Sequence, residues 1–294
     1  MGVKASLFTI LGAMGAAFIG LWARSSRGPA WPTGYTTFVG VVTDFFDTLG
    51  IGSFATTTSL YKLRGAVPDR LIPGTLNVGH TLPTLAQAFI YVAIVRVETT
   101  TLVSMIAAAV AGAWLGAGAV AQWPTRPIRI GLGVALLAAA GLLFAQQLRL
   151  LPPGGEMLGL TGARLAIAVA GNFALGVLMT LGIGLYAPCM ILVSALGMSV
   201  AAAFPIMMGS CAFLMPVAGA RFISKGAYAS AAALGLTLGG IPAVLVAAWV
   251  VRSLPLHALR WLVIVVVLTT AATMLRAAAR EADEPSRSHG GLPR

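Results

Sequence analysis

The sequence TLGIG occupies residues 48–52 and recurs unchanged at residues 180–184, an offset of 132 residues. The same offset, without gaps, aligns 12 identical residues over the 44 positions from Thr48 to Tyr91, where this composition gives about four by chance. In both copies a proline, Pro73 or Pro205, follows the last glycine of the motif by 21 residues. The pattern predicts a chain built from two related halves.

The composition predicts that both halves lie in a membrane. Of 294 residues, 58% are hydrophobic and 9% are charged, with a mean hydropathy of +0.92, whereas soluble domains carry about 25% charged residues. A soluble enzyme with one anchor is therefore excluded, and so is a porin-like barrel, whose strands would alternate polar and apolar residues. The 19 Lys and Arg residues fall almost entirely between apolar runs, where they meet lipid headgroups. The net charge of +11 is thus assigned to the lipid bilayer, and no nucleic-acid partner is expected.

Apolar runs bounded by charge, Pro or Gly predict nine membrane spans, each about 20 residues or longer. They cover residues 5–23, 35–61, 71–94, 98–122, 128–150, 164–195, 199–222, 227–251 and 258–277. The predicted organisation is a leading helix and connector (1–30), a first membrane repeat (31–151), a linker (152–163), a second membrane repeat (164–278) and a disordered tail (279–294).

Each repeat therefore contains about four helices. Four complete crossings return the chain to its starting side, which predicts parallel repeats related by an axis along the membrane normal. If the TLGIG segments are re-entrant, that parity argument no longer applies.

Each Gly-Ile-Gly has two interpretations. Two glycines one residue apart weaken a helix by roughly 1 kcal/mol each. A break in mid-membrane would aim backbone N–H groups at the bilayer centre, where they form an anion site without Lys or Arg. The alternative is close helix packing through small residues. The equivalence of the two copies favours paired broken helices, so the fold class is an all-α polytopic membrane protein with Gly-broken helices at its core.

Asp44 and Asp47 precede the first motif at a spacing that places both on one helix face. Insertion scales assign about 2.5 to 3.5 kcal/mol to each Asp at the centre of a membrane helix, so a buried pair predicts a functional role. The alternative is a cap or loop at the interface. The second half has Gly176 and Met179 at the equivalent positions, so only the first half carries these carboxylates.

Other polar residues also concentrate in the first half, including Gln87 on the span that contains His80. His80 lies near mid-span, where it is either a packed neutral ring or a group that takes up a proton. Hydroxyl groups here can instead bond to their own helices. The predicted substrate-binding residues are Thr48, Gly50, Gly52, Ser53, Thr57, Asn77, His80, Gly182, Gly184 and Ser210. Cys189 and Cys211 lack the spacing of a metal site, and no metal or cofactor is expected.

The segments TDFFDTLGIGSFA (43–55) and IPGTLNVGH (72–80) resemble the TauE/SafE family of sulfite and organosulfonate exporters. The resemblance covers roughly residues 35–277 and is strongest in the first half. It implies duplicated four-helix halves and a sulfur-containing anion as the class of substrate. The chain departs from the family at Gly52-Ser53-Phe54, where the family has three glycines.

We therefore expect a multi-pass protein of the bacterial inner membrane that works as a secondary transporter of a small sulfur-containing or organic anion. Asp44 and Asp47 would repel an anion, so they are assigned to coupling with H⁺ or Na⁺. The alternative is a cation or metabolite permease in which both carboxylates bind the substrate directly. Neither a zinc-binding HExxH pair nor a Ser-His nucleophile arrangement is evident, so an enzyme is not expected.

Overall fold

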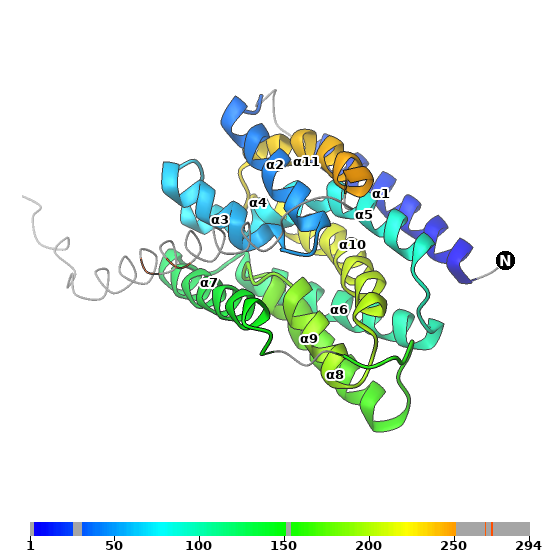
Figure 1. The fold of residues 1–294 in the computed structure, drawn as a ribbon. Coiled ribbons are helices and arrows are strands. Elements are labelled where there is room, and N and C mark those ends of the chain that lie inside the picture. The colour runs from blue at the N-terminus through cyan, green and yellow to red at the C-terminus, as the bar shows by residue number, and fades with distance from the viewer. Residues whose placement is uncertain (1–2, 26–30, 151–153, 251–267, 269–271, 273–294) are drawn as a thin grey trace, which may run out of the picture.

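The computed structural model describes residues 3–25, 31–150, 154–250, 268 and 272, and its regular structure within these ranges is helical (Figure 1). The elements are α1 (Val3–Ser25), α2 (Gly34–Thr48), α3 (Ser53–Arg64), the 3-10 turn η1 (Asp69–Leu71), α4 (Ile72–Gly79), α5 (Thr81–Ile94), α6 (Thr99–Val120), α7 (Thr125–Gln147), α8 (Gly162–Met179), α9 (Tyr186–Ala195), α10 (Val200–Ser224) and α11 (Ser230–Val250).

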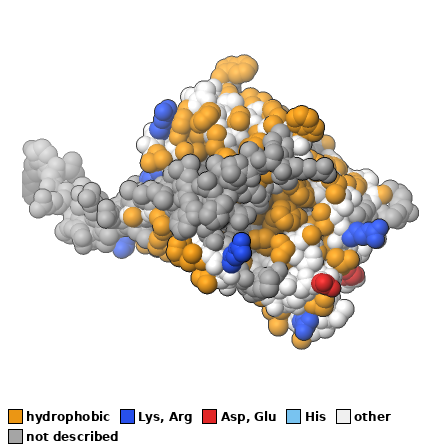
Figure 2. Space-filling model, in the orientation of Figure 1, with side chains coloured by type: hydrophobic (Ala, Val, Ile, Leu, Met, Phe, Trp, Pro, Cys, Tyr) orange, Lys and Arg blue, Asp and Glu red, His pale blue; other side chains and the backbone are white. Residues whose placement is uncertain are grey.

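Five of these helices are long and apolar enough to cross a membrane. They are Ala5–Ser25, Thr99–Val120, Gly162–Met179, Val200–Ser224 and Ser230–Trp249. Hydrophobic side chains are spread over the described part of the surface in Figure 2, and charged side chains on that face are few and scattered. The chain is therefore an all-α polytopic membrane protein, as predicted.

The prediction of nine continuous spans is only partly correct. The run 35–61 is divided between α2 and α3, 71–94 between α4 and α5, and 164–195 between α8 and α9. The span at 258–277 and the tail at 279–294 lie outside the described residues, apart from two isolated positions in the former.

The break between α2 and α3 is a reversal of the chain. The Tyr35 hydroxyl at the start of α2 donates to the carbonyl of Leu60 near the end of α3, and the Arg64 guanidinium lies 4.6 Å from the centroid of the Tyr35 ring. The two helices therefore form a hairpin with TLGIG at its tip. Gly50 has a φ of +84°, which glycine adopts without steric cost.

The break between α8 and α9 is a second hairpin. A Cβ atom at Gly171 in α8 would lie 2.7 Å from Leu192 Cδ2 in α9, so the two helices lie side by side. Gly182 has a φ of +99°. Both tips close through backbone bonds at the same offset of 132 residues: Gly50 N to Asp47 O and Ile51 N to Phe46 O, then Gly182 N to Met179 O and Ile183 N to Leu178 O. These shared turns support the interpretation of the halves as repeats.

The α4–α5 segment and α10 are equivalent in sequence, and they run antiparallel. A Cβ atom at Gly74 would lie 2.0 Å from the carbonyl oxygen of Ala227. The rings of Tyr91 and Phe204, at the opposite ends of the same two segments, stack with centroids 5.4 Å apart. Equivalent helices that run in opposite directions are related by an axis in the membrane plane.

The expected parallel arrangement is therefore wrong for these helices. Its premise was four complete crossings per half. A hairpin returns the chain to the side from which it came, so each half has one crossing fewer than expected. The second half therefore starts on the opposite side of the membrane and has the opposite orientation.

Close packing at glycine extends the same two-fold relationship. In the first pair of helices, Gly40 of α2 lies against Leu236 of α11, and Gly240 of α11 lies against Asp44 of α2. In the equivalent pair, Gly112 of α6 contacts the backbone of α8, and Gly176 of α8 contacts that of α6. Backbones can approach this closely in a membrane only where one residue lacks a side chain.

The two hairpins enter the protein from opposite directions. Helix α2 runs parallel to α11, and α8 runs parallel to α6, because the contacts in each pair rise together in residue number along both helices. For the same reason α11 is parallel to the α4–α5 segment, and α6 is parallel to α10. Because α4–α5 and α10 are antiparallel, α2 and α8 are antiparallel as well. The tips meet where Gly184 approaches Phe54, with 3.9 Å between a Cβ atom at Gly184 and Phe54 Cβ.

The linker between the halves is held against the start of α6. The Glu98 carboxylate accepts hydrogen bonds from the backbone N–H groups of Thr101 and Thr100, each at 2.7 Å, and these bonds lower the pKa of the Glu98 carboxyl to about 2. The N–H of Leu160 in the linker donates to Thr101 Oγ1 at 2.8 Å. Glu98 lies just before the α6 span, so this attachment forms at the membrane edge.

Candidate functional site

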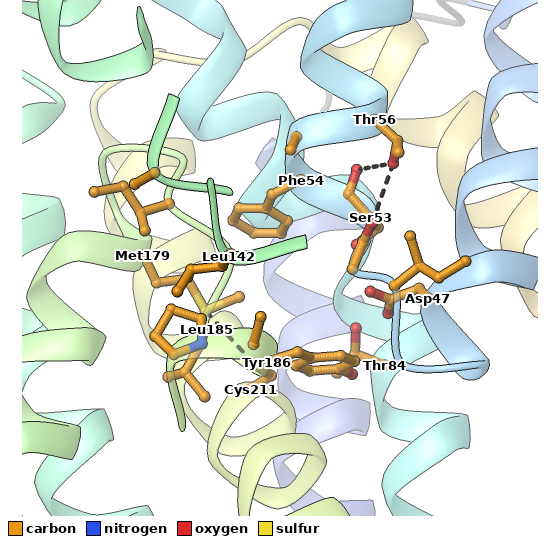
Figure 3. Close-up of a pocket in the computed structure, with 18 of the residues that line it drawn as sticks. Asp47, Ser53, Phe54, Thr56, Thr84, Leu142, Met179, Leu185, Tyr186 and Cys211 are labelled. Atoms are coloured by element: carbon orange, nitrogen blue, oxygen red, sulfur yellow. Dashed lines mark hydrogen bonds between the residues drawn. The ribbon is translucent and has the colours of Figure 1, made fainter. Parts of the chain in front are cut away.

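A cavity of about 50 Å³ lies between the two hairpin tips (Figure 3). This is room for a few water molecules or a small solute. Its lining includes Ile51, Gly52 and Ser53 from the first tip and Ile183, Gly184 and Leu185 from the second. The repeated motif thus supplies both sides of one internal site.

Two helices begin at this cavity. The first turns of α3, from Ser53, and of α9, from Tyr186, are part of the lining, and no side chain caps either helix at its N-cap residue, Gly52 or Leu185. The first N–H groups of a helix have no partner within the helix and carry a partial positive charge. Two such N-termini make the cavity favourable for an anion.

One wall of the cavity is polar and another is rich in sulfur. Asp47, Ser53 and Thr84 contribute oxygen atoms, whereas Met179, Cys211 and Met215 contribute sulfur. Cys211 Sγ lies 3.6 Å from Met179 Sδ. Met179 is the repeat equivalent of Asp47, so the difference between the halves persists inside the cavity.

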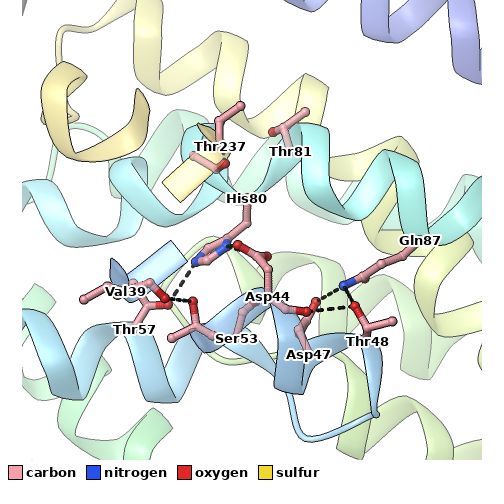
Figure 4. A network of polar contacts seen from close by, with 12 residues as sticks. Val39, Asp44, Asp47, Thr48, Ser53, Thr57, His80, Thr81, Gln87 and Thr237 are labelled. Carbon is pink, nitrogen blue, oxygen red and sulfur yellow. Dashed lines mark hydrogen bonds and ion pairs between the residues drawn. The ribbon is translucent and has the colours of Figure 1, made fainter. Parts of the chain in front are cut away.

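Asp44 belongs to a buried chain of polar groups beside the cavity (Figure 4). His80 Nδ1 lies 2.9 Å from Asp44 Oδ1 and 3.0 Å from Oδ2, and His80 Nε2 lies 3.0 Å from Thr57 Oγ1. All three residues are fully buried. Because α2 supplies Asp44 and α3 supplies Thr57, His80 joins the two arms of the first hairpin.

His80 occupies the junction of α4 and α5 because Pro83 interrupts the helix there. Pro83 lacks the N–H that would bond to the carbonyl of Gly79. Thr237 of α11 donates to that carbonyl instead, at 2.7 Å. The break is thus satisfied from the second half, which holds the His80 backbone in place.

Asp47 belongs to a second chain, which joins the two halves. Gln87 Nε2 donates to Asp47 Oδ2 at 2.9 Å and to Thr48 Oγ1 at 3.0 Å, and the Tyr186 hydroxyl donates to Gln87 Oε1 at 2.6 Å. Tyr186 begins α9 in the second hairpin, and Gln87 lies in α5. The second hairpin is therefore linked to the carboxylate of the first through a single amide.

No family model, curated protein or solved structure matches this chain. Among the described residues, no group of three or more His, Cys, Asp and Glu side chains could hold a metal ion.

The residues chosen from the sequence divide into three groups. Gly52, Ser53, Gly184 and the coupling candidate Asp47 line the cavity. Thr48, Thr57, His80 and Asp44 belong to the two polar chains. Gly50, Gly182, Asn77 and Ser210 are outside the lining: the two glycines form the tip turns, the Asn77 amide donates to Pro73 O, and Ser210 accepts from Asn172.

The two carboxylates lie inside the protein. Asp44 is 0% exposed and Asp47 is 3% exposed, so neither carboxylate is exposed as a cap or loop at the interface would be. The Thr48 hydroxyl donates to the carbonyl of Asp44 in its own helix at 2.8 Å. This is the bond within one helix that was the alternative role for the hydroxyl groups of the first half.

Tyr186 and Thr84 are the main polar side chains that the sequence interpretation did not assign to the site, and Gln87 was noted only as polar. Tyr186 follows Gly184 by two residues, at the position equivalent to Phe54. The signal available in the sequence was that the second copy has a tyrosine, with a hydroxyl group, where the first copy has a phenylalanine. Its meaning depended on the partner in α5, which sequence spacing does not reveal.

Proposed function

We propose that the protein is a secondary transporter that carries a small sulfur-containing or organic anion, of the sulfite or sulfonate class, across the bacterial inner membrane. The observation that carries the proposal is the pair of uncapped helix N-termini, α3 and α9, that meet at one cavity. A site formed by backbone N–H groups attracts an anion without a fixed cation, which suits an ion that must be released again. The motif resemblance supplies the sulfur-containing class of substrate.

In this proposal the Asp44–His80 pair carries a coupling proton. Both carboxylate oxygens of Asp44 lie within 3.0 Å of His80 Nδ1, so the pair is built to share a proton. A sodium ion would have to displace that contact to reach the carboxylate. Gly240, which packs against Asp44 Oδ2, leaves no space on that side. Proton coupling is therefore favoured over sodium coupling.

The test is uptake of labelled sulfite and of a small sulfonate into proteoliposomes, with imposed pH or Na⁺ gradients. We expect a pH gradient to drive transport and Asp44→Asn to abolish its dependence on pH. Asp69→Asn is the matched control, because Asp69 pairs with Lys62 away from the cavity. Transport by Asp44→Asn with an unchanged pH dependence would remove the coupling role, and transport of neither anion would refute the proposed substrate class.

The second candidate function is a cation or metabolite permease. The observation in its favour is that Asp47 itself lines the cavity, where a carboxylate attracts cations. Competition separates the two functions. Inhibition of labelled sulfite uptake by other anions supports the first, and uptake of a labelled small cation that sulfite does not affect supports the second.

A further inference from the structure

A long apolar groove runs along α1, α6 and α10, away from the hairpin tips. It consists of two adjoining hollows of about 480 and 790 Å³, which share Trp114 and Val217 in their linings. The remaining lining is almost entirely apolar side chains of these three helices, with small residues such as Ala17, Ala111 and Ala220 forming part of its floor.

The groove is long enough to hold a lipid chain. Its lining extends from Leu7 to Leu21 along α1, which is about 21 Å at 1.5 Å per residue. One leaflet of the hydrocarbon core is about 15 Å thick. A groove of this length can accept an acyl chain along its whole extent in one leaflet.

A cation is fixed at one end of the groove. Arg221 lines the smaller hollow in the last turn of α10, and its Cζ atom lies 4.4 Å from the centroid of the Trp114 ring. The described residues include five Asp and Glu side chains, and none of the ion pairs among these residues involves Arg221. A positioned guanidinium that pairs with none of these described carboxylates is a binding group for phosphate.

Further positive charge lies at the same end. Phe18 of α1 packs against Gly219 of α10, and Leu7 lines the groove with Phe213, so the two helices run in the same direction. Arg24 lies in the last turn of α1, and Lys225 directly follows α10. The groove therefore passes from a cationic end into a purely apolar channel, which is the charge pattern of an anionic phospholipid.

We propose that this groove binds an anionic phospholipid, with the headgroup phosphate on the Arg221 guanidinium and an acyl chain between α1 and α6. Basic pockets between membrane helices are sites for anionic headgroups. The ring of Trp114 holds the guanidinium in place and forms the wall against which the first part of the chain packs.

The test is native mass spectrometry of the full chain in detergent, with added phosphatidylglycerol or phosphatidylcholine. We expect phosphatidylglycerol to bind more tightly and Arg221→Gln to weaken its binding about five- to tenfold, the effect of one cation at a membrane surface. Arg64→Gln is the matched control, because Arg64 also stacks on a ring, that of Tyr35, but lines neither hollow. Ala111→Phe, which fills the apolar channel and leaves Arg221 intact, should weaken the binding of both lipids.

Four results would overturn the proposal. Equal binding of the two lipids, or equal binding by Arg221→Gln and Arg64→Gln, would show that Arg221 does not recognise the headgroup. Full competition by inorganic phosphate would make this a site for a free anion. A dimer whose formation Ala111→Phe prevents would make the groove an interface between two copies of the chain. None of these outcomes depends on whether the protein transports an anion.

Discussion

Removal of the Tyr186 hydroxyl should destabilise the protein through Gln87. In Tyr186→Phe the Gln87 Oε1 atom loses its donor, which lies at 2.6 Å, while the amide remains fully buried. Rotation of the amide does not restore a partner, because Nε2 already donates to Asp47 and Thr48. A buried acceptor left without a partner costs about 1 to 3 kcal/mol, so we expect the free energy of unfolding to fall by that amount.

The assay is reversible denaturant unfolding in mild detergent, arranged as a double-mutant cycle with Gln87→Leu. Tyr186→Phe should cost markedly less in the Gln87→Leu background, because the orphaned carbonyl is no longer present. Tyr228→Phe is the control: it removes a phenol with no hydrogen bond among those described and should change stability by less than about 0.5 kcal/mol. An equal cost of Tyr186→Phe in both backgrounds would refute the link between the halves.

Two further substitutions test the packing around the site and the capping of α6. A Cβ atom at Gly240 would lie 2.2 Å from Asp44 Oδ2, so Gly240→Ala should displace the carboxylate, destabilise the protein by about 1 to 3 kcal/mol and impair transport. Gly12→Ala, which enters open space, should do neither, and equal stability of the two variants in a thermal melt would contradict the predicted contact. The pKa of the Glu98 carboxyl is lowered to about 2, so its stabilising effect is complete above the unfolded-state pKa and disappears as the pH falls through about 2. Glu98→Gln should therefore lower the unfolding temperature at pH 7, with the difference from wild type narrowing towards pH 2; Glu156→Gln should show no such trend, and a deficit constant with pH would contradict the capping role.

The sequence predicted the membrane class and the helix breaks at both copies of TLGIG, because these depend on local composition and on the repeat. It did not predict that α2 and α3 fold back on each other. The run 35–61 contains no Lys, Arg or Pro that would divide it, and hydropathy has the same value whether a chain crosses or turns. The evidence for the turn is the left-handed backbone at Gly50 and the contact between Tyr35 and Leu60, which appear only in three dimensions.

The geometry of the candidate site could be predicted from the sequence only in part. The spacing of Asp44 and Asp47 and the position of His80 on the next apolar run singled out the helices that carry the two polar chains. Their division into two separate chains, one through His80 and one through Gln87, depends on how α5 packs on the first hairpin. Gln87 and Tyr186 lie 99 residues apart in sequence. The residue pattern of a single chain does not reveal that two such distant residues are in contact.

The polar chain of the first half has no counterpart in the second. At the repeat offset, Asp44, Thr57 and His80 correspond to Gly176, Cys189 and Ala212. An inverted scaffold would otherwise present similar chemistry to both sides of the membrane, but the Asp44–His80 pair belongs to the first half, and its equivalents, Gly176 and Ala212, carry no titratable group. The two sides of the hairpin pair are therefore chemically distinct. Under the proposed proton coupling, molecules inserted in opposite orientations would move substrate in the same direction, which the pH gradient sets, but at different rates.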